Sequence, residues 1–430
     1  MKRWLLFLWL PLGMTLWAQA PVHQEVEMEA TSGSKVGISL APPVLDQVDA
    51  ASAEKDFTAV VLRDLEEAGP FAVIRKNTPA SAEDGTFPVW AQLGTQWLVI
   101  PRLTRRTADE LEVNIQVKHP RSGKSVFSKK YTGKDSVLRR IAHTVADDLV
   151  GQLTGDRGVA GTRVVFVKQI APSVKEIFQV DRDGANVLQL TRHGSLTISP
   201  TVAPDGRLAY VTYKGGAPEI WGQKRPGGAH VKLYPTSVGK PEGNCYSPAW
   251  SPDGKRLAFI QGDRRGNTDI MVLDADSGRV RRLTDSNCLN SEPCWNPAGT
   301  QIAFTSDRAG GPQVYLMEED GSNVRRLTHE GNYNASPSWS PTGAMIAYVS
   351  RFEGKFDLFV YKLGEGKSYQ ITKGVQSSES PSWSPDERRL VYTLNTGRGL
   401  QLFTTDLSGA TVRSLMDLSG CQSPKWTRSR

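Results

Sequence analysis

The sequence predicts a mainly β protein in which a small α/β domain precedes a six-bladed β-propeller. The first observation is a repeated phrase of the form Ser-Pro-x-Trp-Ser-Pro, at residues 247–252, 336–341 and 380–385. Degenerate copies of the phrase stand at Ser199-Pro200 and Glu292-Pro293, and a shortened copy, here called the C-terminal stub, lies at 423–426. The second observation is the period, because the first prolines of successive copies lie 43 to 48 residues apart. A repeat of about 40–50 residues is typical of a propeller blade of four short strands.

Each repeat carries the same order of strand signals after its phrase. Alternating apolar runs at 257–260, 302–305 and 346–349 predict second strands, and the repeats end on Leu-Thr or a relative of it. Asp-Gly pairs between the runs suit two-residue hairpin turns, because glycine accepts the positive φ that these turns need. Proline lacks a backbone donor, so we expect the phrase at the beginning of the innermost strand, with its tryptophan packed between neighbouring blades.

The two ends of the repeat region predict how the ring closes. Residues 164–191 supply the second, third and fourth strands of a blade but lack the phrase, whereas the C-terminal stub has the phrase and nothing after it. Joined, they make one blade beside five complete ones. We therefore expect a propeller over 160–430 that is sealed by its own C-terminus, which leaves only short strand edges exposed.

The first 35 residues read as a leader and an arm. Residues 1–20 begin with positive charge, continue through an apolar stretch and end on Ala18-Gln19-Ala20, which is the pattern of a secretory signal peptide. Residues 21–35 are polar, and the alternation of Glu25, Val26, Glu27 and Met28 can mark a strand. Two interpretations stay open here: an arm that adds itself to another sheet, and a plain disordered tail.

Residues 36–157 show mixed helix and strand signals and predict the α/β domain. Strands are expected at 36–40, 97–100, 111–115 and 126–127. One helix follows the apolar spacing of 57–65 and ends at Gly69, and a second runs through 137–149. For the second helix we expect a cap at Asp135 or Ser136 and an end at Gly155. Residues 155–161 then form the expected hinge to the propeller.

Charge and motif searches exclude several functions. The formal net charge of +7 falls to +5 without Lys2 and Arg3, and no basic cluster with interleaved aromatics indicates nucleic acid. The sequence has no Gly-x-Ser-x-Gly, His-Glu-x-x-His or phosphate-loop motif. No catalytic, cofactor or metal residue is therefore assigned. A periplasmic enzyme or small-ligand binder that uses the central channel remains the alternative, because propellers build such sites from scattered residues.

The four cysteines are Cys245, Cys288, Cys294 and Cys421. Exported proteins permit disulfides, and four cysteines allow three full connectivities. Cys288 and Cys294 flank one inner strand and form the best candidate pair, while four buried or free thiols are the other interpretation.

The whole pattern resembles the TolB family of the periplasmic Tol–Pal system. The resemblance rests on the order of signal peptide, short arm, α/β domain and six blades. Residues 143–148, 153–155 and 162–165 look like the family's join between domains, and 331–337 look like its turn between the fourth and fifth blades. The resemblance implies a periplasmic binding hub, expected to be a monomer, rather than an enzyme. A TolB-like paralogue that serves another envelope complex is a further alternative.

The resemblance also implies partners and contact residues. The propeller mouth would receive the lipoprotein Pal, which would tie the protein to the outer membrane, and the system would support membrane integrity and constriction at division. The arm, through Glu25–Met28, would engage TolA. Ser291 and Glu292 match a family Pal contact pair, although Glu292 can also be read as a solvated loop acid. Calcium in the channel is possible by analogy, but no carboxylate cluster demands it. Further candidates for the Pal-binding rim are Asn244, Asn290 and Asn334.

Overall fold

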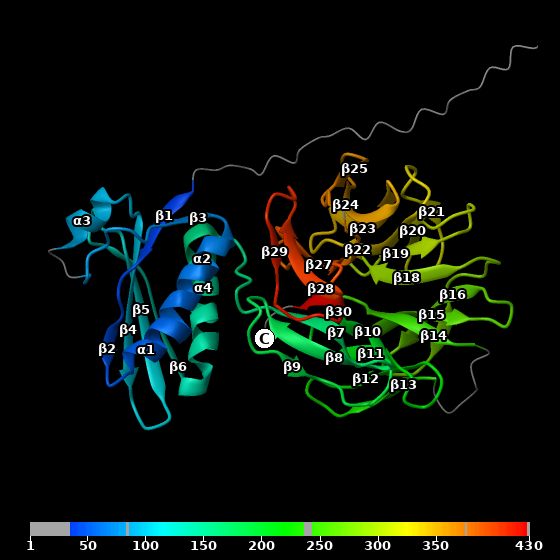
Figure 1. Ribbon diagram of the computed structural model, residues 1–430, viewed down its shortest axis with the longest axis horizontal. Helices are drawn as coiled ribbons and strands as arrows, with labels where there is room; N and C mark the ends of the chain where they lie inside the picture. Colours follow the sequence, from blue (N-terminus) through cyan, green and yellow to red (C-terminus); the bar gives the residue numbers. More distant parts are fainter. Residues whose placement is uncertain (1–34, 83–85, 236–242, 375, 428–430) are drawn as a thin grey trace, which may run out of the picture.

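The structure is a computed structural model that describes residues 35–82, 86–235, 243–374 and 376–427 (Figure 1). The predicted signal peptide and the arm up to residue 34 lie outside the described residues. Two bodies lie side by side, an α/β domain and a six-bladed β-propeller, so the predicted fold class is confirmed. Within the described ranges, no helix is both long and apolar enough to cross a membrane.

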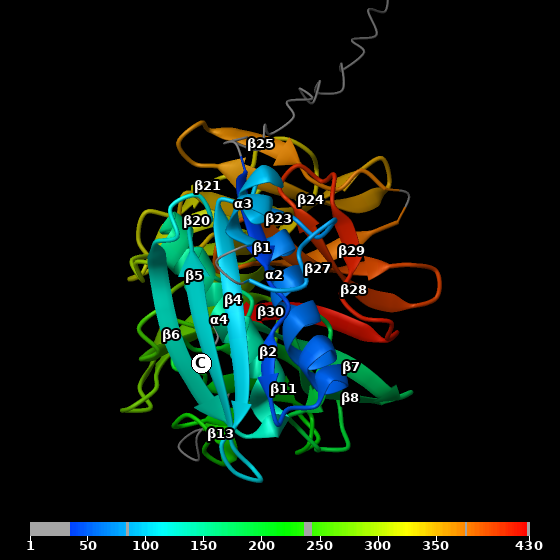
Figure 2. The same cartoon turned by 90° about the vertical axis from the view of Figure 1, so that its left-hand side faces the viewer.

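The α/β domain is built on one six-stranded sheet. Its strand order is β3-β1-β4-β5-β6, with β2 paired to β4. Helices α2 and α4 lie between this sheet and the propeller, as Figure 1 and the turned view in Figure 2 show. The strands are β1 (Val36–Leu40), β2 (Val44–Asp46), β3 (Phe71–Val73), β4 (Trp97–Arg105), β5 (Leu111–Lys118) and β6 (Ser125–Gly133). The helices are α1 (Ala50–Ala53), α2 (Ala59–Ala68), α3 (Phe87–Gln92) and α4 (Leu138–Thr154).

The two long helices follow the predicted apolar spacing but begin differently from the expectation. A π-helical turn at Glu54–Thr58 joins α1 to α2, and both helices end on glycines with positive φ, Gly69 at 93° and Gly155 at 75°. The predicted side-chain cap of α4 at Asp135 or Ser136 is wrong, because a 3-10 turn at Asp135–Val137 precedes the helix. The Asp135 carboxylate instead pairs with Arg105 on β4 at 2.8 Å.

The propeller consists of six four-stranded antiparallel blades. Blades 1 to 5 follow one another along the chain, and in blade 6 the C-terminal strand β30 pairs with β7, so the predicted closure of the ring is confirmed. Blade 1 is β10 (Thr197–Val202), β11 (Leu208–Thr212), β12 (Glu219–Gln223) and β13 (His230–Tyr234). Blade 2 is β14 (Cys245–Trp250), β15 (Arg256–Gly262), β16 (Thr268–Asp274) and β17 (Val280–Arg282). Blade 3 is β18 (Asn290–Trp295), β19 (Gln301–Ser306), β20 (Gln313–Glu318) and β21 (Arg325–Arg326).

The remaining blades have the same order of strands. Blade 4 is β22 (Asn334–Trp339), β23 (Met345–Phe352), β24 (Lys355–Lys362) and β25 (Lys367–Gln370). Blade 5 is β26 (Ser378–Trp383), β27 (Arg389–Asn395), β28 (Leu400–Asp406) and β29 (Val412–Ser414). Blade 6 is β30 (Cys421–Thr427), β7 (Arg163–Ala171), β8 (Val174–Asp181) and β9 (Leu188–Gln189).

Every innermost strand contains a β-bulge at the proline of the repeated phrase. The proline lies in the middle of the strand, not at its beginning as expected, and the ladder register shifts across it in all six blades. A bulge leaves one residue unpaired, so the missing N–H of proline costs no ladder hydrogen bond there. The residue before each proline has a φ between 50° and 55°; the set is Ser199, Ser247, Glu292, Ser336, Ser380 and Ser423.

The tryptophan of the phrase packs between blades, as predicted. Trp295 joins an apolar cluster with Ala258, Val272 and Leu283 of the preceding blade, and its indole N–H donates to the Ala249 carbonyl at 3.1 Å. Five blades carry tryptophan at this position, namely Trp250, Trp295, Trp339, Trp383 and Trp426, whereas β10 carries Val202. One of the six seams between blades is therefore packed differently.

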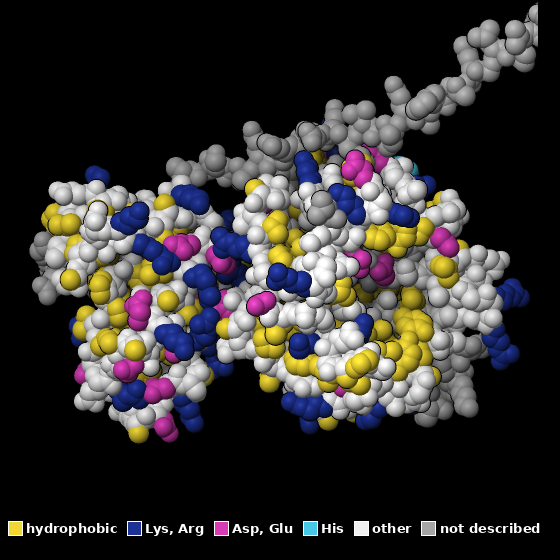
Figure 3. Space-filling view, viewed as in Figure 1, with side chains coloured by type: hydrophobic (Ala, Val, Ile, Leu, Met, Phe, Trp, Pro, Cys, Tyr) yellow, Lys and Arg dark blue, Asp and Glu magenta, His cyan; other side chains and the backbone are white. Residues whose placement is uncertain are grey.

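A cluster of ion pairs joins the two domains. Asp183, in the turn after β8, accepts hydrogen bonds from Arg63 of α2 and Arg139 of α4, and its side chain is only 1% exposed. Burial alone would raise the pKa of Asp183, but the Ala185 N–H and the nearby Arg63, His143 and Arg139 charges lower it below its ordinary value. Figure 3 shows Lys and Arg side chains gathered along this junction.

The connection between the domains follows a fixed path. The Asp147 carboxylate on α4 accepts hydrogen bonds from the backbone N–H groups of Ala160 and Gly161 at 2.6 and 3.0 Å. Val159 and Ala160 are buried, and burial raises the pKa of Asp147. The C-terminal end of the predicted hinge over 155–161 is therefore hydrogen-bonded to α4.

Candidate partner-binding surface

The mouth of the propeller is the end of the channel where the innermost strands begin. All five residues proposed from the sequence lie at or next to the first residues of these strands. Asn244 is exposed immediately before β14, and Ser291 and Glu292 are half-buried in the first half of β18. Asn290 and Asn334 are the first residues of β18 and β22.

Asn290 and Asn334 are buried, at 0% and 1% exposed, so their side chains are not available to a partner. The Asn290 amide donates to the Thr268 carbonyl at 2.8 Å, and its oxygen accepts from Arg308 at 2.9 Å. The Asn334 amide donates to the Glu330 carbonyl at 2.7 Å. The repeat position put both residues at the start of an inner strand, but their amides bind the preceding blade, Asn290 at Thr268 of blade 2 and Asn334 at Gln313 of blade 3. We therefore remove them from the candidate surface.

Glu292 forms a bridge from blade 3 to blade 4. Its carboxylate accepts hydrogen bonds from the Ser336 backbone N–H at 2.7 Å, the Ser336 hydroxyl at 2.6 Å and the Thr305 hydroxyl at 2.9 Å. The other five blades have serine at this position. A serine side chain is too short to span this distance in the same way. The mouth is therefore not six-fold symmetric, and blade 3 differs from the other five blades at this position.

A groove that sequence reasoning missed lies at the N-terminal end of β18, where Leu289 stands three residues before Glu292 in the chain. It is a hollow of about 580 Å³ between the turns of blades 2 and 3. Leu289, immediately before β18, lines it and is 49% exposed. Arg265 and Asn287 are exposed polar groups of the same lining. Leu289 is thus an exposed apolar side chain with polar groups around it, an arrangement that a partner can cover with an apolar centre and a polar rim. A single leucine in a loop gives no periodic signal, so nothing in the sequence pointed to it.

The sequence matches the TolB beta propeller domain over residues 150–430 and the TolB amino-terminal domain over residues 24–125. The chain belongs to the TolB family. A protein described as a TolB homolog from Chlorobium chlorochromatii is 35% identical over 198 residues, which are 46% of this chain and 43% of that protein. Another from Chlorobaculum tepidum is 42% identical over 164 residues, 38% of this chain and 36% of the relative. The matched region is thus less than half the length of each of these relatives.

A solved structure covers much more of this TolB-family chain. TolB from Acinetobacter baumannii matches with a TM-score of 0.77 and 26% identity, over 92% of this chain and 97% of that one. The structure of a putative TolB from Agrobacterium tumefaciens matches at 20% identity with a TM-score of 0.50, over 61% of this chain and 91% of that one, which shows the fold alone.

The residues at this TolB-family channel do not fit calcium well. Calcium takes about six to eight oxygen ligands. The Glu292 oxygens already accept three hydrogen bonds from Ser336 and Thr305. Lys425 of β30 is close enough to Cys294 of β18 for its positive charge to act on that thiol, which opposes a further cation there. We derive no role for calcium from these residues.

In the described residues, the one group that could hold a metal is at the domain junction, not in the channel. It consists of His143, Asp181 and Asp183. Because Asp183 already accepts hydrogen bonds from Arg63 and Arg139, a cation there would face two positive charges.

The four cysteines are free, so the proposed Cys288–Cys294 disulfide is wrong. The Cys288 thiol lies 3.0 Å from the Ser286 hydroxyl, while the Cys294 sulfur accepts a hydrogen bond from the Trp339 backbone N–H. The two sulfurs thus point to different neighbours on the two sides of the bulge in β18. Burial raises the pKa of Cys245 to about 12 and that of Cys421 to about 11. These two thiols therefore stay protonated at neutral pH, which makes them poor nucleophiles.

Proposed function

We propose that this protein is a periplasmic binding component of the Tol–Pal envelope system and not an enzyme. In this proposal the propeller mouth docks the lipoprotein Pal, and the N-terminal arm engages TolA. The complex would support outer-membrane integrity and constriction at division. Membership of the TolB family and the secretory pattern of residues 1–20 support the proposal.

The observation that carries the Pal proposal is the groove at Leu289, which lies at the same end of β18 as the hydrogen-bonded Glu292 carboxylate. Leu289 offers apolar area that a partner can cover, and Arg265 offers charge at the rim. Glu292 is held by hydrogen bonds from Ser336 and Thr305, so little conformational freedom is lost when a partner docks against it. Interfaces typically have an apolar centre and a polar rim, and Leu289 with its polar neighbours can supply both.

Replacing Leu289 with glutamate is expected to weaken Pal binding by at least about 30-fold, which corresponds to about 2 kcal/mol at an interface hot spot. The reason is that the substitution removes the apolar anchor and puts a charge in the groove. Isothermal titration of a Pal periplasmic domain into residues 21–430 measures this. Leu188→Glu is the matched control, because Leu188 is 51% exposed on β9, the outer strand of blade 6, and Leu289 is 49% exposed.

Equal affinity of the Leu289→Glu and Leu188→Glu proteins would contradict the mouth as the docking surface. Absence of Pal binding by the unmodified protein would contradict Pal as the partner. Charge reversal at Glu292 is a poorer test, because Glu292 also joins blades 3 and 4 and its loss would disturb the mouth itself.

Removal of residues 21–35 is expected to abolish binding of a TolA periplasmic domain while the propeller stays folded. The alternating residues Glu25, Val26, Glu27 and Met28 would add a strand to a TolA sheet through main-chain hydrogen bonds. Titration of TolA into the two chains measures this, and the thermal midpoint of each chain serves as the folding control. Undiminished TolA binding by the shortened chain would show that the arm is a plain tail.

A further inference from the structure

The seam between blades 6 and 1 lacks the tryptophan that fills the other five seams. The position holds Val202 on β10, and Val202 is only partly buried against Val165 and Leu208. Trp295 shows what the tryptophan contacts elsewhere, since it packs on Ala258, Val272 and Leu283 of the preceding blade. Trp339 and Trp383 pack in the same way in their own clusters.

Strand register identifies the matching contact residues in blade 6. In blade 2, Ala258 pairs with Val272. The Leu283 N–H donates to the carbonyl of Ile270, which lies two residues before Val272, at 2.8 Å. In blade 6, Val165 pairs with Gln179, and the Leu190 N–H donates to Ile177 at 2.8 Å. The residues equivalent to the three contacts of Trp295 are therefore Val165, Gln179 and Leu190.

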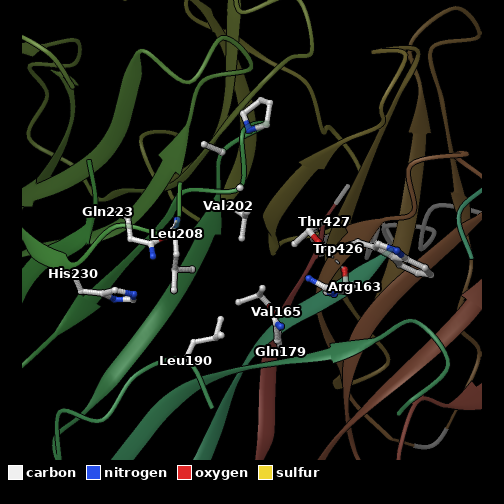
Figure 4. A pocket seen from close by; sticks show the side chains of 14 residues that line it. Arg163, Val165, Gln179, Leu190, Val202, Leu208, Gln223, His230, Trp426 and Thr427 are labelled. Carbon is white, nitrogen blue, oxygen red and sulfur yellow. Dashed lines mark hydrogen bonds between the residues drawn. The ribbon is translucent and has the colours of Figure 1, made fainter. Parts of the chain in front are cut away.

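These three residues line a cavity of about 430 Å³ (Figure 4). Figure 4 shows Val165, Leu190, Val202 and Leu208 around an open space, with His230 on one side and Arg163 on the other. The cavity therefore occupies the place that an indole ring takes at the other seams. Its volume exceeds the ~150 Å³ of an apolar cavity that holds benzene and lies within the ~300–1,000 Å³ of ligand sites.

Arg163 matches the guanidinium that faces the tryptophan ring at two other seams. Arg207 lies over the Trp250 ring at 4.7 Å, and Arg256, the first residue of β15, lies over the Trp295 ring at 4.6 Å. Arg163 is likewise the first residue of β7, and it lines the seam cavity, where its Nε pairs with Asp181 at 3.4 Å. A guanidinium over an aromatic face gains cation–π energy, so Arg163 provides one wall that suits a ring.

Two polar groups in the lining can select a ring that carries an N–H. Gln179 replaces an apolar wall residue, and its amide has no hydrogen-bond partner among the described residues. His230 uses Nδ1 in a hydrogen bond of 2.8 Å with the Tyr210 hydroxyl, which leaves Nε2 for a ligand. Burial, and the neighbouring His193, lower the pKa of His230, so the ring is neutral at pH 7 and Nε2 is a neutral hydrogen-bonding atom.

We propose that the seam cavity between blades 6 and 1 binds a planar aromatic group of indole size. The ring would enter between Val202 and Leu190, stack on Arg163 and hydrogen-bond to Gln179 or His230. It can come from a free aromatic compound or from a tryptophan side chain of another polypeptide. The cavity lies next to the last residue of β10, at the opposite end of the inner strands from the mouth, so this proposal is independent of Pal binding.

The test is titration of methyl-labelled residues 21–430 with indole, and separately with the tripeptide Gly-Trp-Gly. Ring-current shifts are expected at the methyl groups of Val165, Leu190, Val202 and Leu208, and at no methyl group of Val324 in blade 3. At about 0.3–1.5 kcal/mol per heavy atom, nine ring atoms predict a dissociation constant in the millimolar range or below. A shift with indole alone assigns the site to free aromatic compounds, and shifts with both probes assign it to either source.

Val202→Trp is the deciding variant, because it places the chain's own indole in the cavity. It is expected to abolish the indole shifts and to raise the thermal midpoint by about 2–4 °C, as cavity-filling changes do. Val324→Trp adds the same side chain at an exposed position and is expected to change neither. Should Val202→Trp fail to fold, Val202→Phe serves in its place. The absence of methyl shifts with either probe, or indole shifts that persist unchanged in the filled variant, would overturn the proposal.

Discussion

Replacing Asp183 with asparagine is expected to lower the free energy of unfolding by about 3 kcal/mol. Asp183 is 1% exposed and is the shared acceptor of Arg63 and Arg139, which belong to two different helices of the α/β domain. His143 also lies 3.4 Å from its carboxylate. Removing one partner of a buried ion pair typically costs about 3–5 kcal/mol, because the remaining charge is left uncompensated. The lower end applies here, since Arg63 and Arg139 keep 35% and 22% of their side chains exposed.

Urea denaturation followed by tryptophan fluorescence measures this loss, and Asp320→Asn is the matched control. Asp320 lies in the equivalent turn of blade 3, where its carboxylate accepts the Ser322 N–H at 2.9 Å as Asp183 accepts the Ala185 N–H at 3.0 Å. Asp320 is exposed and forms no ion pair to the other domain within the described residues. A change at Asp183 no larger than the change at Asp320 would show that the junction contributes nothing beyond the turn itself.

The ion pairs of the domain junction extend beyond Asp183, and they predict how substitutions there combine in lowering the free energy of unfolding. Glu67 of α2 receives Arg182 at 2.7 Å, Arg389 at 3.3 Å and Arg413 at 3.1 Å, so three blade strands or turns share one carboxylate. Glu67 and Asp183 belong to one network, because Asp64 lies near both Arg182, a partner of Glu67, and His143, a neighbour of Asp183. Substitution energies within one network do not add. A variant that lacks both Asp183 and Glu67 is therefore expected to differ from the sum of the two single changes.

The propeller was predictable because its information is local and repeated. Every copy of the phrase carries its proline and five of the six carry the tryptophan, so blade count and closure followed from spacing alone. The position of the proline inside the strand was not predictable, because it depends on the residue before it, such as Ser247 or Glu292, adopting a left-handed backbone conformation with positive φ. A bulge of this kind is a property of two paired strands, and one strand's sequence does not reveal it.

The candidate surface was predicted only in part, for a geometrical reason. Repeat position placed Asn290 and Ser291 near the mouth, but adjacent residues of a strand point to opposite sides, so the first is buried and the second half-buried. Leu289 lies one residue earlier, outside the strand, where no alternation applies. Val202 is the reverse case. The sequence already shows that this degenerate repeat lacks a tryptophan. The cavity, however, becomes visible only when blades 6 and 1 are placed together.

Ending the chain at Gly420 is expected to abolish cooperative folding of the propeller. The truncation removes β30, which pairs with β7 at Cys421, Gln422, Lys425, Trp426 and Thr427. Loss of a fully buried tryptophan costs about 3–5 kcal/mol. Trp426 is partly buried and contributes a share of this, and its indole N–H also donates to the Thr162 hydroxyl at 2.8 Å. Together with the lost ladder this approaches the whole stability of about 5–15 kcal/mol of a typical domain.

The truncated chain would also expose a new strand edge. β7 would present its unpaired N–H and C=O groups along Arg163–Ala171, an edge of the kind that promotes aggregation. Size-exclusion chromatography and thermal unfolding measure both effects, and a chain that ends at Thr427 keeps β30 and serves as the control. Because β30 contributes a complete strand, a synthetic peptide of residues 421–430 is expected to restore a monomeric, cooperatively unfolding propeller by strand addition. A truncated chain that unfolds cooperatively without the peptide would show that five blades hold together without the seal.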